Sequence, residues 1–306
     1  MRWWRGLRLL PLLLLVLALV GASCAPLRPA VAPAPASEGY AHPELLAETD
    51  WLAQHLEDPA LRIVDMRPRD QYQAGHIPGA VHLDGARLKD DANRLYVIPP
   101  DKFERLMSEL GIGNDTTVVA YDADGGLWAA RLWWVLDYYG HTRAKVLNGG
   151  WVKWTRENRP TTTAEPKVAP ATFTARPNPA VICTLDEVKA AIDRPNAVII
   201  DARSPAEYSG TDVRAKRGGH IPSAVNIDWR QNITEDLKVF KPAAELRQLY
   251  ESKGITKDKE IITYCQTAVR AAHTFFTLRL IGYGQIRNYD GSWAEWGNRE
   301  DTPIQR

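Results

Sequence analysis

The chain carries the same four sequence blocks twice in the same order, and this duplication constrains its fold more than any other feature. The separation is 136 residues between Asp65 and Asp201 and 144 between His76 and His220, so the second copy holds eight extra residues before its Gly-His-Ile-Pro. The matched blocks are Arg62–Tyr72 with Ala197–Tyr208, Gly75–Val81 with Gly219–Val225, Thr117–Asp122 with Glu260–Cys265, and Asn148–Trp154 with Asp290–Trp296. Four matched blocks in register predict two tandem copies of one domain.

Within each copy, short apolar runs alternate with helical patterns, which is typical of a largely parallel sheet. In the second copy the expected strands are Ala197–Asp201, Ala224–Ile227, Glu260–Tyr264 and Gln285–Tyr289, and the expected helices are Thr184–Ile192, Ala243–Ser252 and Ala271–Ile281. The predicted fold class is α/β, with two tandem domains that are each a mostly parallel sheet flanked by helices.

Composition shifts give the expected boundaries of these domains. The segments are a signal at 1–24, a Pro/Ala linker at 25–40, a first domain at 41–158, a second linker at 159–180 and a second domain at 181–306. The Pro/Ala linker cannot build a core and suits a spacer.

The N-terminus has the layout of a secretory signal. Arg2, Arg5 and Arg8 precede the apolar run Leu9–Val20, which is too short for a spanning helix and is followed by small residues and Cys24. Cys24 at the cleavage point resembles the bacterial lipoprotein signal, whose cysteine is lipidated; plain secretion is the alternative. We therefore expect an exported protein of the periplasm or cell envelope, attached to the membrane through a lipidated Cys24.

Net charge gives no support for a polyanionic partner. Loss of the signal removes three arginines and no acid, which leaves 35 basic and 37 acidic residues. A chain with this balance is not predicted to bind nucleic acid, and an anionic substrate would have to be held locally.

The three cysteines differ in context. Cys183 precedes Thr184, the expected N-cap of a helix with Glu187 at its third position, so a structural role is predicted. We expect Cys183 to lie too far from Cys265 to form a disulfide. No Cys or His spacing indicates a metal site.

Cys265 opens a six-residue loop between a buried strand and an apolar helix, and Arg270 closes this loop. Backbone N–H groups at a helix N-terminus can form a nest for an anion, and the same field favours a reactive thiolate. The alternative from the loop alone is a small buried cysteine at the end of a strand.

The order of motifs resembles the rhodanese family. Both copies carry Asp-x-Arg with a following Tyr, then Gly-His-Ile-Pro and a Gly-x-Trp-x-x-Trp segment, and the second has a strand that ends in a cysteine loop. The duplication resembles the two-domain thiosulfate and 3-mercaptopyruvate sulfurtransferases. In those proteins only the C-terminal copy is catalytic, and Asp122 stands here where Cys265 stands in the second copy.

The resemblance implies sulfur transfer through a persulfide on Cys265, with thiosulfate as donor and cyanide or a thiol as acceptor, and with no metal or organic cofactor. The loop amides of Gln266, Thr267, Ala268, Val269 and Arg270 would bind the substrate and stabilise the sulfur anion. The first copy's loop, with two carboxylates, would repel an anion and wall the cleft.

Loop length and loop residues bear on the substrate. Phosphatases of this fold have a loop one residue longer, so the position of Arg270 favours sulfur transfer over phosphate hydrolysis. Gln266 and Thr267 match neither the basic pair typical of thiosulfate enzymes nor the Gly and Ser of mercaptopyruvate enzymes. Bacterial family members with a similar Gln-Thr pair favour thiosulfate, and mercaptopyruvate is the alternative. Ala268 would be mildly strained if this position requires positive φ.

Candidate cations near the site are Arg270 and, from the inserted segment, Lys216 and Arg217, because the family uses a basic residue there. The family's other donor-binding arginine is replaced by Glu207. Arg203 recurs in the inactive copy, so we expect it to pair structurally with a carboxylate.

His76 and His220 also recur, which indicates a turn device rather than general bases. The repeated tryptophans are expected in the core, with Trp293 a candidate for the cleft. Two functions remain open: an exported enzyme, or a non-catalytic persulfide carrier for a membrane-associated partner.

Overall fold

The computed structural model describes residues 39–306, and these belong to one compact unit. Cys24 and the predicted signal lie outside the described residues. Within residues 39–306, no helix combines the length and apolar character that crossing a membrane requires.

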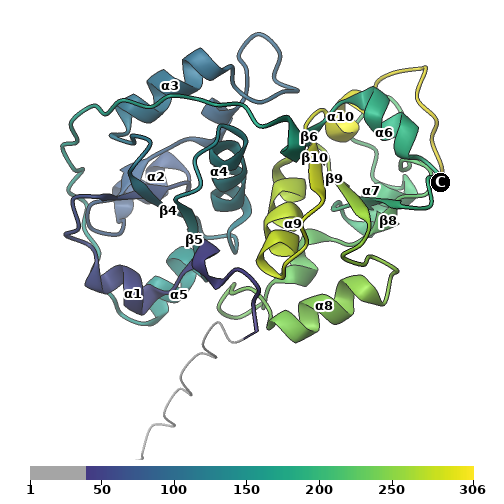
Figure 1. Ribbon diagram of the computed structural model, residues 1–306. Coiled ribbons are helices and arrows are strands. Elements are labelled where there is room, and N and C mark those ends of the chain that lie inside the picture. The colour runs from purple at the N-terminus through teal and green to yellow at the C-terminus, as the bar shows by residue number, and fades with distance from the viewer. Residues whose placement is uncertain (1–38) are drawn as a thin grey trace, which may run out of the picture. The chain divides into compact units, whose positions relative to one another are not determined.

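The first copy is a five-stranded sheet with helices packed on it (Figure 1). Its elements are η1 Pro43–Leu45, β1 Leu46–Ala47, α1 Thr49–Gln54, β2 Leu61–Asp65, α2 Arg69–Ala74, β3 Val81–His82, η2 Gly85–Leu88, α3 Pro100–Glu109, β4 Thr117–Tyr121, α4 Leu127–Tyr138, β5 Ala144–Leu147 and α5 Gly150–Arg156. Every strand pair in this sheet is parallel, in the order β1-β5-β4-β2-β3.

The second copy repeats this order of elements. They are η3 Pro179–Val181, β6 Ile182–Cys183, α6 Leu185–Ala191, β7 Ala197–Asp201, α7 Pro205–Ser209, β8 Val225–Asn226, η4 Trp229–Asn232, α8 Ala243–Glu251, β9 Glu260–Tyr264, α9 Val269–Leu280, β10 Ile286–Tyr289 and α10 Ser292–Trp296. The strand order β6-β10-β9-β7-β8 is the counterpart of the first sheet, again with parallel pairs. The predicted α/β fold with two tandem parallel sheets is confirmed.

Local signals placed several elements correctly. Strands β7 and β9 have the predicted bounds, and α6 begins with the predicted capping box, in which Thr184 and Glu187 bond each other's backbone. Helix α9 begins at Val269, two residues before the predicted start, because Ala268 already serves as its N-cap.

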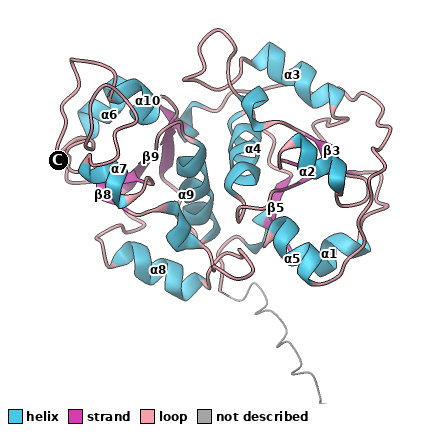
Figure 2. Cartoon of the chain, turned by 180° about the vertical axis from the view of Figure 1, so that it is seen from behind, coloured by secondary structure: helices cyan, strands magenta, loops and turns pink. Residues whose placement is uncertain are grey.

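The two sheets share one continuous core on their facing sides. Alternate residues of β4 point to opposite faces, as in any strand: Val118 and Ala120 join a large cluster with α3 and α4, whereas Val119 and Tyr121 join a separate outer cluster. The large cluster continues into the second copy through α9, which packs against α4 (Figures 1 and 2).

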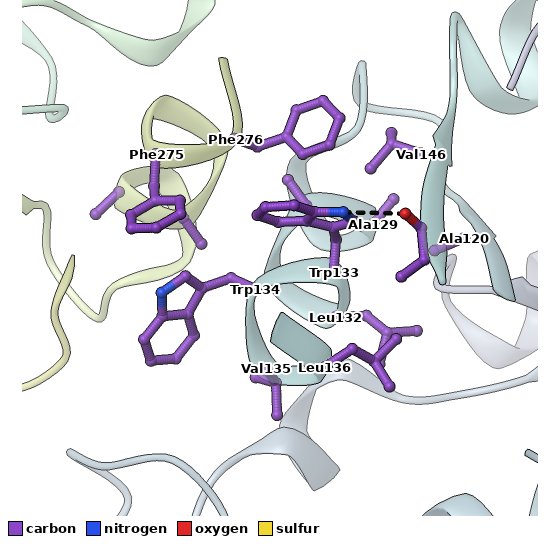
Figure 3. Packing of buried hydrophobic residues seen from close by; sticks show 14 of the residues in the cluster. Ala120, Ala129, Leu132, Trp133, Trp134, Val135, Leu136, Val146, Phe275 and Phe276 are labelled. Atoms are coloured by element: carbon purple, nitrogen blue, oxygen red, sulfur yellow. Dashed lines mark hydrogen bonds between the residues drawn. The ribbon is translucent and has the colours of Figure 1, made fainter. Parts of the chain in front are cut away.

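Aromatic side chains fill the contact between these two helices. Trp133 of α4 meets Phe276 of α9 edge to face at 5.0 Å between ring centroids, and Phe275 lies beside it (Figure 3). This arrangement brings the N-terminal ends of α4 and α9, and the loops before them, into contact across the two copies.

Candidate active site

Cys265 lies at the carboxyl end of β9, directly before the loop that leads into α9. Its N–H donates to Ser292 Oγ at 3.2 Å, and its carbonyl accepts from the Trp293 N–H at 2.9 Å. The Gln266 carbonyl accepts from the Ala294 N–H at 2.9 Å. The segment Asp290–Trp296, which is the last matched block of the repeat, therefore holds the backbone of the cysteine loop. The Cys265 side chain is buried, at 1% exposure.

Ala268 adopts the left-handed conformation, with φ 60° and ψ 11°. This confirms the positive φ suspected from the sequence and costs more for alanine than for glycine. Among residues 39–306, the N–H groups of Gln266, Thr267 and Ala268 have no hydrogen-bond partner. Together with the first amides of α9, they leave a set of free donors at the head of the helix.

The first copy shows what such donors can hold. The Asp122 carboxylate accepts four backbone N–H bonds, from Asp124 at 2.8 Å, Gly126 at 2.9 Å, Trp128 at 2.7 Å and Ala129 at 3.0 Å. Asp122 is 1% exposed, and burial raises its pKa while the amide bonds oppose that rise. The carboxylate that we expected to repel an anion is itself the anion bound in the loop.

The two loops place their N–H donors at equivalent positions. Gly126 and Ala268 are both left-handed N-caps. The next two donors of the first copy, Trp128 and Ala129, are the second and third residues of α4. Arg270 and Ala271 occupy those places in α9. The first loop has five residues between strand and helix, and the second has four.

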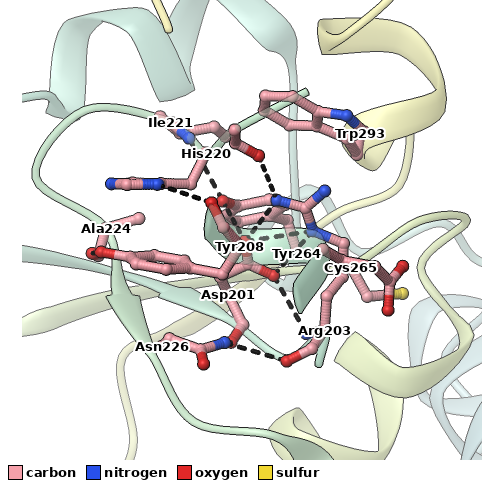
Figure 4. Close-up of polar contacts among 12 residues, drawn as sticks. Asp201, Arg203, Tyr208, His220, Ile221, Ala224, Asn226, Tyr264, Cys265 and Trp293 are labelled. Atoms are coloured by element: carbon pink, nitrogen blue, oxygen red, sulfur yellow. Dashed lines mark hydrogen bonds and ion pairs between the residues drawn. The ribbon is translucent and has the colours of Figure 1, made fainter. Parts of the chain in front are cut away.

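A buried polar cluster lies beside each loop and is nearly identical in the two copies. Arg203 Nη2 donates to Asp201 Oδ2 at 2.6 Å and to the Gly219 carbonyl at 2.8 Å, and Tyr264 Oη donates to Asp201 at 2.6 Å (Figure 4). The Cys265 sulfur points away from this cluster.

In the first copy the corresponding distances, from Arg67 to Asp65 and to Gly75 and from Tyr121 to Asp65, are 2.6, 2.7 and 2.5 Å. Because the cluster is the same with and without a thiol, the predicted structural pairing of Arg203 is confirmed.

The histidines of the Gly-His-Ile-Pro segments serve the turn, as expected. His76 Nδ1 lies 2.9 Å from the Tyr72 carbonyl, and His220 Nδ1 lies 2.9 Å from the Tyr208 carbonyl. Each imidazole stacks on the same tyrosine, at 3.9 and 3.6 Å between centroids.

Arg270 forms a bidentate ion pair with Glu207, at 2.6 Å from Nη1 to Oε2 and 2.8 Å from Nη2 to Oε1. Burial alone would raise the pKa of Glu207, but the Arg270 bonds and the capping bonds from Ser204 lower it to about 2. Burial would likewise lower the pKa of Arg270, and Glu207 together with the nearby Cys265 raises it instead. The sequence identified Glu207 as a departure from the family but not as the partner of Arg270.

The inserted segment contacts the loop through its backbone. Gln266 Nε2 donates to the Arg214 carbonyl at 3.0 Å. The Arg217 guanidinium is bound by the C-terminal segment, where it donates to the carbonyls of Trp296 and Thr302 at 3.1 and 3.0 Å, and Lys216 is exposed. A donor-binding role for Lys216 or Arg217 stays a prediction.

The sequence analysis missed a buried charge network that joins the two copies at the loop. Arg131 of α4 donates from Nη1 to Asp290 Oδ1 at 2.8 Å and to the Ala268 carbonyl at 3.4 Å. Lys89 Nζ lies 3.2 Å from the same Asp290 oxygen. Burial and then Arg131 lower the pKa of Lys89 to about 8, and the two cations hold the pKa of Asp290 low although burial opposes this.

A second contact runs from the second copy to the loop of the first copy. His273 occupies in α9 the place that Arg131 occupies in α4, and its Nε2 lies 3.0 Å from the Gly125 carbonyl of the first loop. Each helix therefore touches the loop of the other copy. The repeat alignment could have suggested this pairing, because both residues are polar within apolar helices.

Cys183 and Cys265 are both free thiols, and β10 lies between the strands that carry them. Burial raises the pKa of Cys183. Within the described residues, no three His, Cys, Asp or Glu side chains are grouped to hold a metal ion.

The chain matches the rhodanese-like domain family twice, at residues 48–157 and 184–299. The sulfur carrier protein TtuD of Thermus thermophilus is 42% identical over 285 residues, which are 88% of this chain and 99% of that protein. The thiosulfate sulfurtransferase of Corynebacterium glutamicum is 37% identical over 286 residues, covering 89% and 94%. The crystal structure of SseA from Escherichia coli, described among 3-mercaptopyruvate sulfotransferases, aligns with a TM-score of 0.73 at 31% identity, covering 81% and 98%.

Proposed function

This chain belongs to the rhodanese-like domain family, and from that premise we propose that it is a thiosulfate sulfurtransferase. The observation that carries the mechanism is the contrast between two matching loops. One binds its own carboxylate through four amides, and the other presents a thiol to the same kind of cradle with its amides free. A cradle built for a negative charge stabilises both a thiolate and a persulfide.

In the first half-reaction, the Cys265 thiolate attacks the outer sulfur of thiosulfate. The new Sγ–S bond forms as the bond between the two donor sulfurs breaks, and its electron pair leaves with sulfite. The amides of Ala268, Arg270 and Ala271, by analogy with those around Asp122, would take up the negative charge on the terminal sulfur.

In the second half-reaction, cyanide or a thiolate attacks the terminal sulfur of the persulfide. The acceptor gains that sulfur, and the electron pair of the cleaved bond returns to Sγ as the thiolate. Because the sulfur passes through a covalent intermediate, ping-pong kinetics are expected. Arg270 would keep the loop closed, with its charge balanced by Glu207.

Relatives favour thiosulfate over mercaptopyruvate as donor. Two relatives that are 37% and 35% identical to this chain are named thiosulfate sulfurtransferase. The two donors separate in a direct assay: thiocyanate formation from thiosulfate and cyanide should exceed pyruvate release from mercaptopyruvate. Faster turnover of mercaptopyruvate would reverse the assignment.

A persulfide carrier is the second candidate. It is favoured by the near-complete burial of Cys265, which would shield a persulfide from solvent, and by the 42% identity to a protein named as a sulfur carrier. Stoichiometric persulfide without steady-state turnover would support the carrier, and sustained thiocyanate production would support the enzyme.

Export and lipid attachment at Cys24 remain part of this proposal. They rest on the arginines, the apolar run and the small residues before Cys24. Intact-mass spectrometry of protein from its native membrane fraction should detect a lipid on Cys24. An unprocessed N-terminus would count against export.

A further inference from the structure

A cavity lies at the carboxyl ends of β6 and β10, and Asp290 of the buried charge network is among the residues that line it. Its volume is about 550 Å³, and both copies line it. Tyr96 and Tyr138 come from the first copy, and Tyr289 and Glu295 come from the second. The cavity also reaches Cys183 and the first turn of α6 but not Cys265. The sulfur-transfer mechanism does not use it.

The duplicated scaffold shows why this place is open. In the first copy, Lys153 Nζ binds Glu48 Oε2 at 2.6 Å and lies 4.0 Å from Glu157, so an ion-pair cluster occupies the ends of β1 and β5. Asn148 adds a 2.8 Å bond to Glu48. The charges of Lys153, Glu48 and Glu157 are therefore balanced within the cluster.

In the second copy the same places carry residues that cannot pair in this way. Glu295 stands where Lys153 stands, Thr184 where Glu48 stands, and Arg299 where Glu157 stands. Thr184 is used in its own capping box, and the Arg299 guanidinium is bound by Asp301 at 2.8 and 2.9 Å. The cation at the centre of the first cluster has thus become an anion in the second.

Glu295 forms no ion pair in the part of the chain that the structure describes, although Arg299, whose guanidinium is bound by Asp301, also lines the cavity. Its two oxygens accept from the phenols of Tyr96 and Tyr289, each at 2.8 Å. Burial and the bond to Glu295 raise the pKa of Tyr96 to about 12, so the phenol keeps its proton. Asp186 adds a second lining carboxylate with no ion-pair partner within residues 39–306.

The three tyrosine rings that line the cavity differ in exposure: Tyr289 is buried, Tyr138 is half-buried and Tyr96 is accessible. Tyr96 is 39% exposed, one of two large hydrophobic side chains that are exposed in the described residues. Aromatic faces next to unpaired carboxylates attract organic cations, because the ring quadrupole and the anion act in the same direction. The same surroundings disfavour an anionic ligand.

We propose that the cavity lined by Tyr96, Tyr138, Tyr289 and Glu295 is a second binding site, which takes an organic cation with a flat body and an ammonium group. The cation would lie against the tyrosine rings, with its charge near Glu295 and Asp186. The site is independent of the sulfur-transfer proposal. It adjoins the active loop through α10, whose Ala294 N–H binds the Gln266 carbonyl, and through Asp290, which lines the cavity and pairs with Arg131.

The test is isothermal titration of the full-length protein with benzyltrimethylammonium, and with phenylacetate as the anionic counterpart. We expect saturable binding of the cation and none of the anion. Glu295→Gln and Tyr96→Ala should each weaken the cation's binding roughly tenfold, since each removes part of a charge and aromatic cage. Tyr96→Phe keeps the ring, so its affinity should stay within about twofold of the wild type.

Glu300→Gln is the matched control, because it removes an exposed carboxylate close in sequence that does not line the cavity. Thermal melts of each variant would verify folding, and the exposed Tyr96 should tolerate substitution even if Glu295 does not. The proposal is overturned if the cation fails to bind, if phenylacetate binds equally well, or if Tyr96→Ala and Glu300→Gln have the same effect.

Discussion

The two loops that precede α4 and α9 are built alike and differ in the residue at their head. The first places Asp122 under four backbone N–H groups, so its charge is satisfied internally. The second places Cys265 at the matching position, and its loop amides have no partner within the described residues 39–306. The scaffold therefore supplies an anion cradle in both copies, and the head residue decides whether it holds a side chain or a reacting sulfur.

The neighbourhood of the loops supports this division. The Asp–Arg–Tyr cluster and the histidine turn are the same in both copies, so they serve the fold. The Arg270–Glu207 pair occurs only beside the cysteine, because the first copy has Trp128 and Gln71 at the corresponding places.

The largest effect should come from removing the nucleophile. Cys265→Ser keeps the shape of the loop but lacks the thiolate, so thiocyanate formation should fall by at least about 10⁴-fold. Cys183→Ser is the matched control, because this buried thiol lies outside the loop and should leave the rate unchanged. Equal losses in both variants would refute the distinction between the thiols.

The next largest effect should come from breaking the contacts between the two copies. Arg131→Met breaks the contact of the first copy with Asp290 and Ala268, and loss of one partner in a buried pair should cost about 3 kcal/mol of unfolding free energy. It should also slow alkylation of Cys265 by iodoacetamide at neutral pH, because the loop loses its support.

His273→Leu is the reciprocal change, since it removes the contact with the inactive loop. We expect it to lower stability while the rate of Cys265 alkylation at neutral pH stays unchanged. If the two variants slow this alkylation equally, Arg131 has no special role at the active loop.

The Glu207–Arg270 pair should make stability depend on acid. The pKa of Glu207 falls from 4.5 to about 2 on folding, so the pair stabilises fully above about pH 4.5, and this contribution is lost as the pH approaches 2. Urea unfolding of Glu207→Gln should show a smaller decline in unfolding free energy than the wild type over this range.

The Glu207→Gln variant should also have a severalfold lower KM for thiosulfate, because Arg270 regains its free charge. An unchanged KM would separate Arg270 from donor binding.

The smallest effect on sulfur transfer is expected from the inactive loop. Asp122→Asn keeps the size of the side chain but replaces one acceptor oxygen with an NH2 group, so two of the four N–H groups lose their acceptor, at a cost of about 1–3 kcal/mol each in unfolding free energy. The kcat of sulfur transfer should change less than about twofold when the protein is folded. A large loss of kcat with full stability would mean that Asp122 acts on the reaction itself.

Sequence reasoning located the sheets and the Cys265 loop, and it predicted that Arg203 pairs with a carboxylate, because these features depend on local pattern and on repetition. It did not find that Asp122 fills its own loop, since the sequence shows a charge but not which N–H groups surround it. It also missed Arg131 with Asp290 and Glu207 with Arg270. These partners are separated by 159 and 63 residues, and the packing of α4 against α9 or the pairing of β7 with β9 brings them together.

The most direct test of the shared cradle is a crystal structure of the protein after treatment with thiosulfate. The account predicts one extra sulfur atom on Cys265 Sγ, within hydrogen-bond range of the N–H groups of Ala268, Arg270 and Ala271, which match the donors to Asp122. Extra density on Cys183, or a terminal sulfur turned away from those amides, would contradict it.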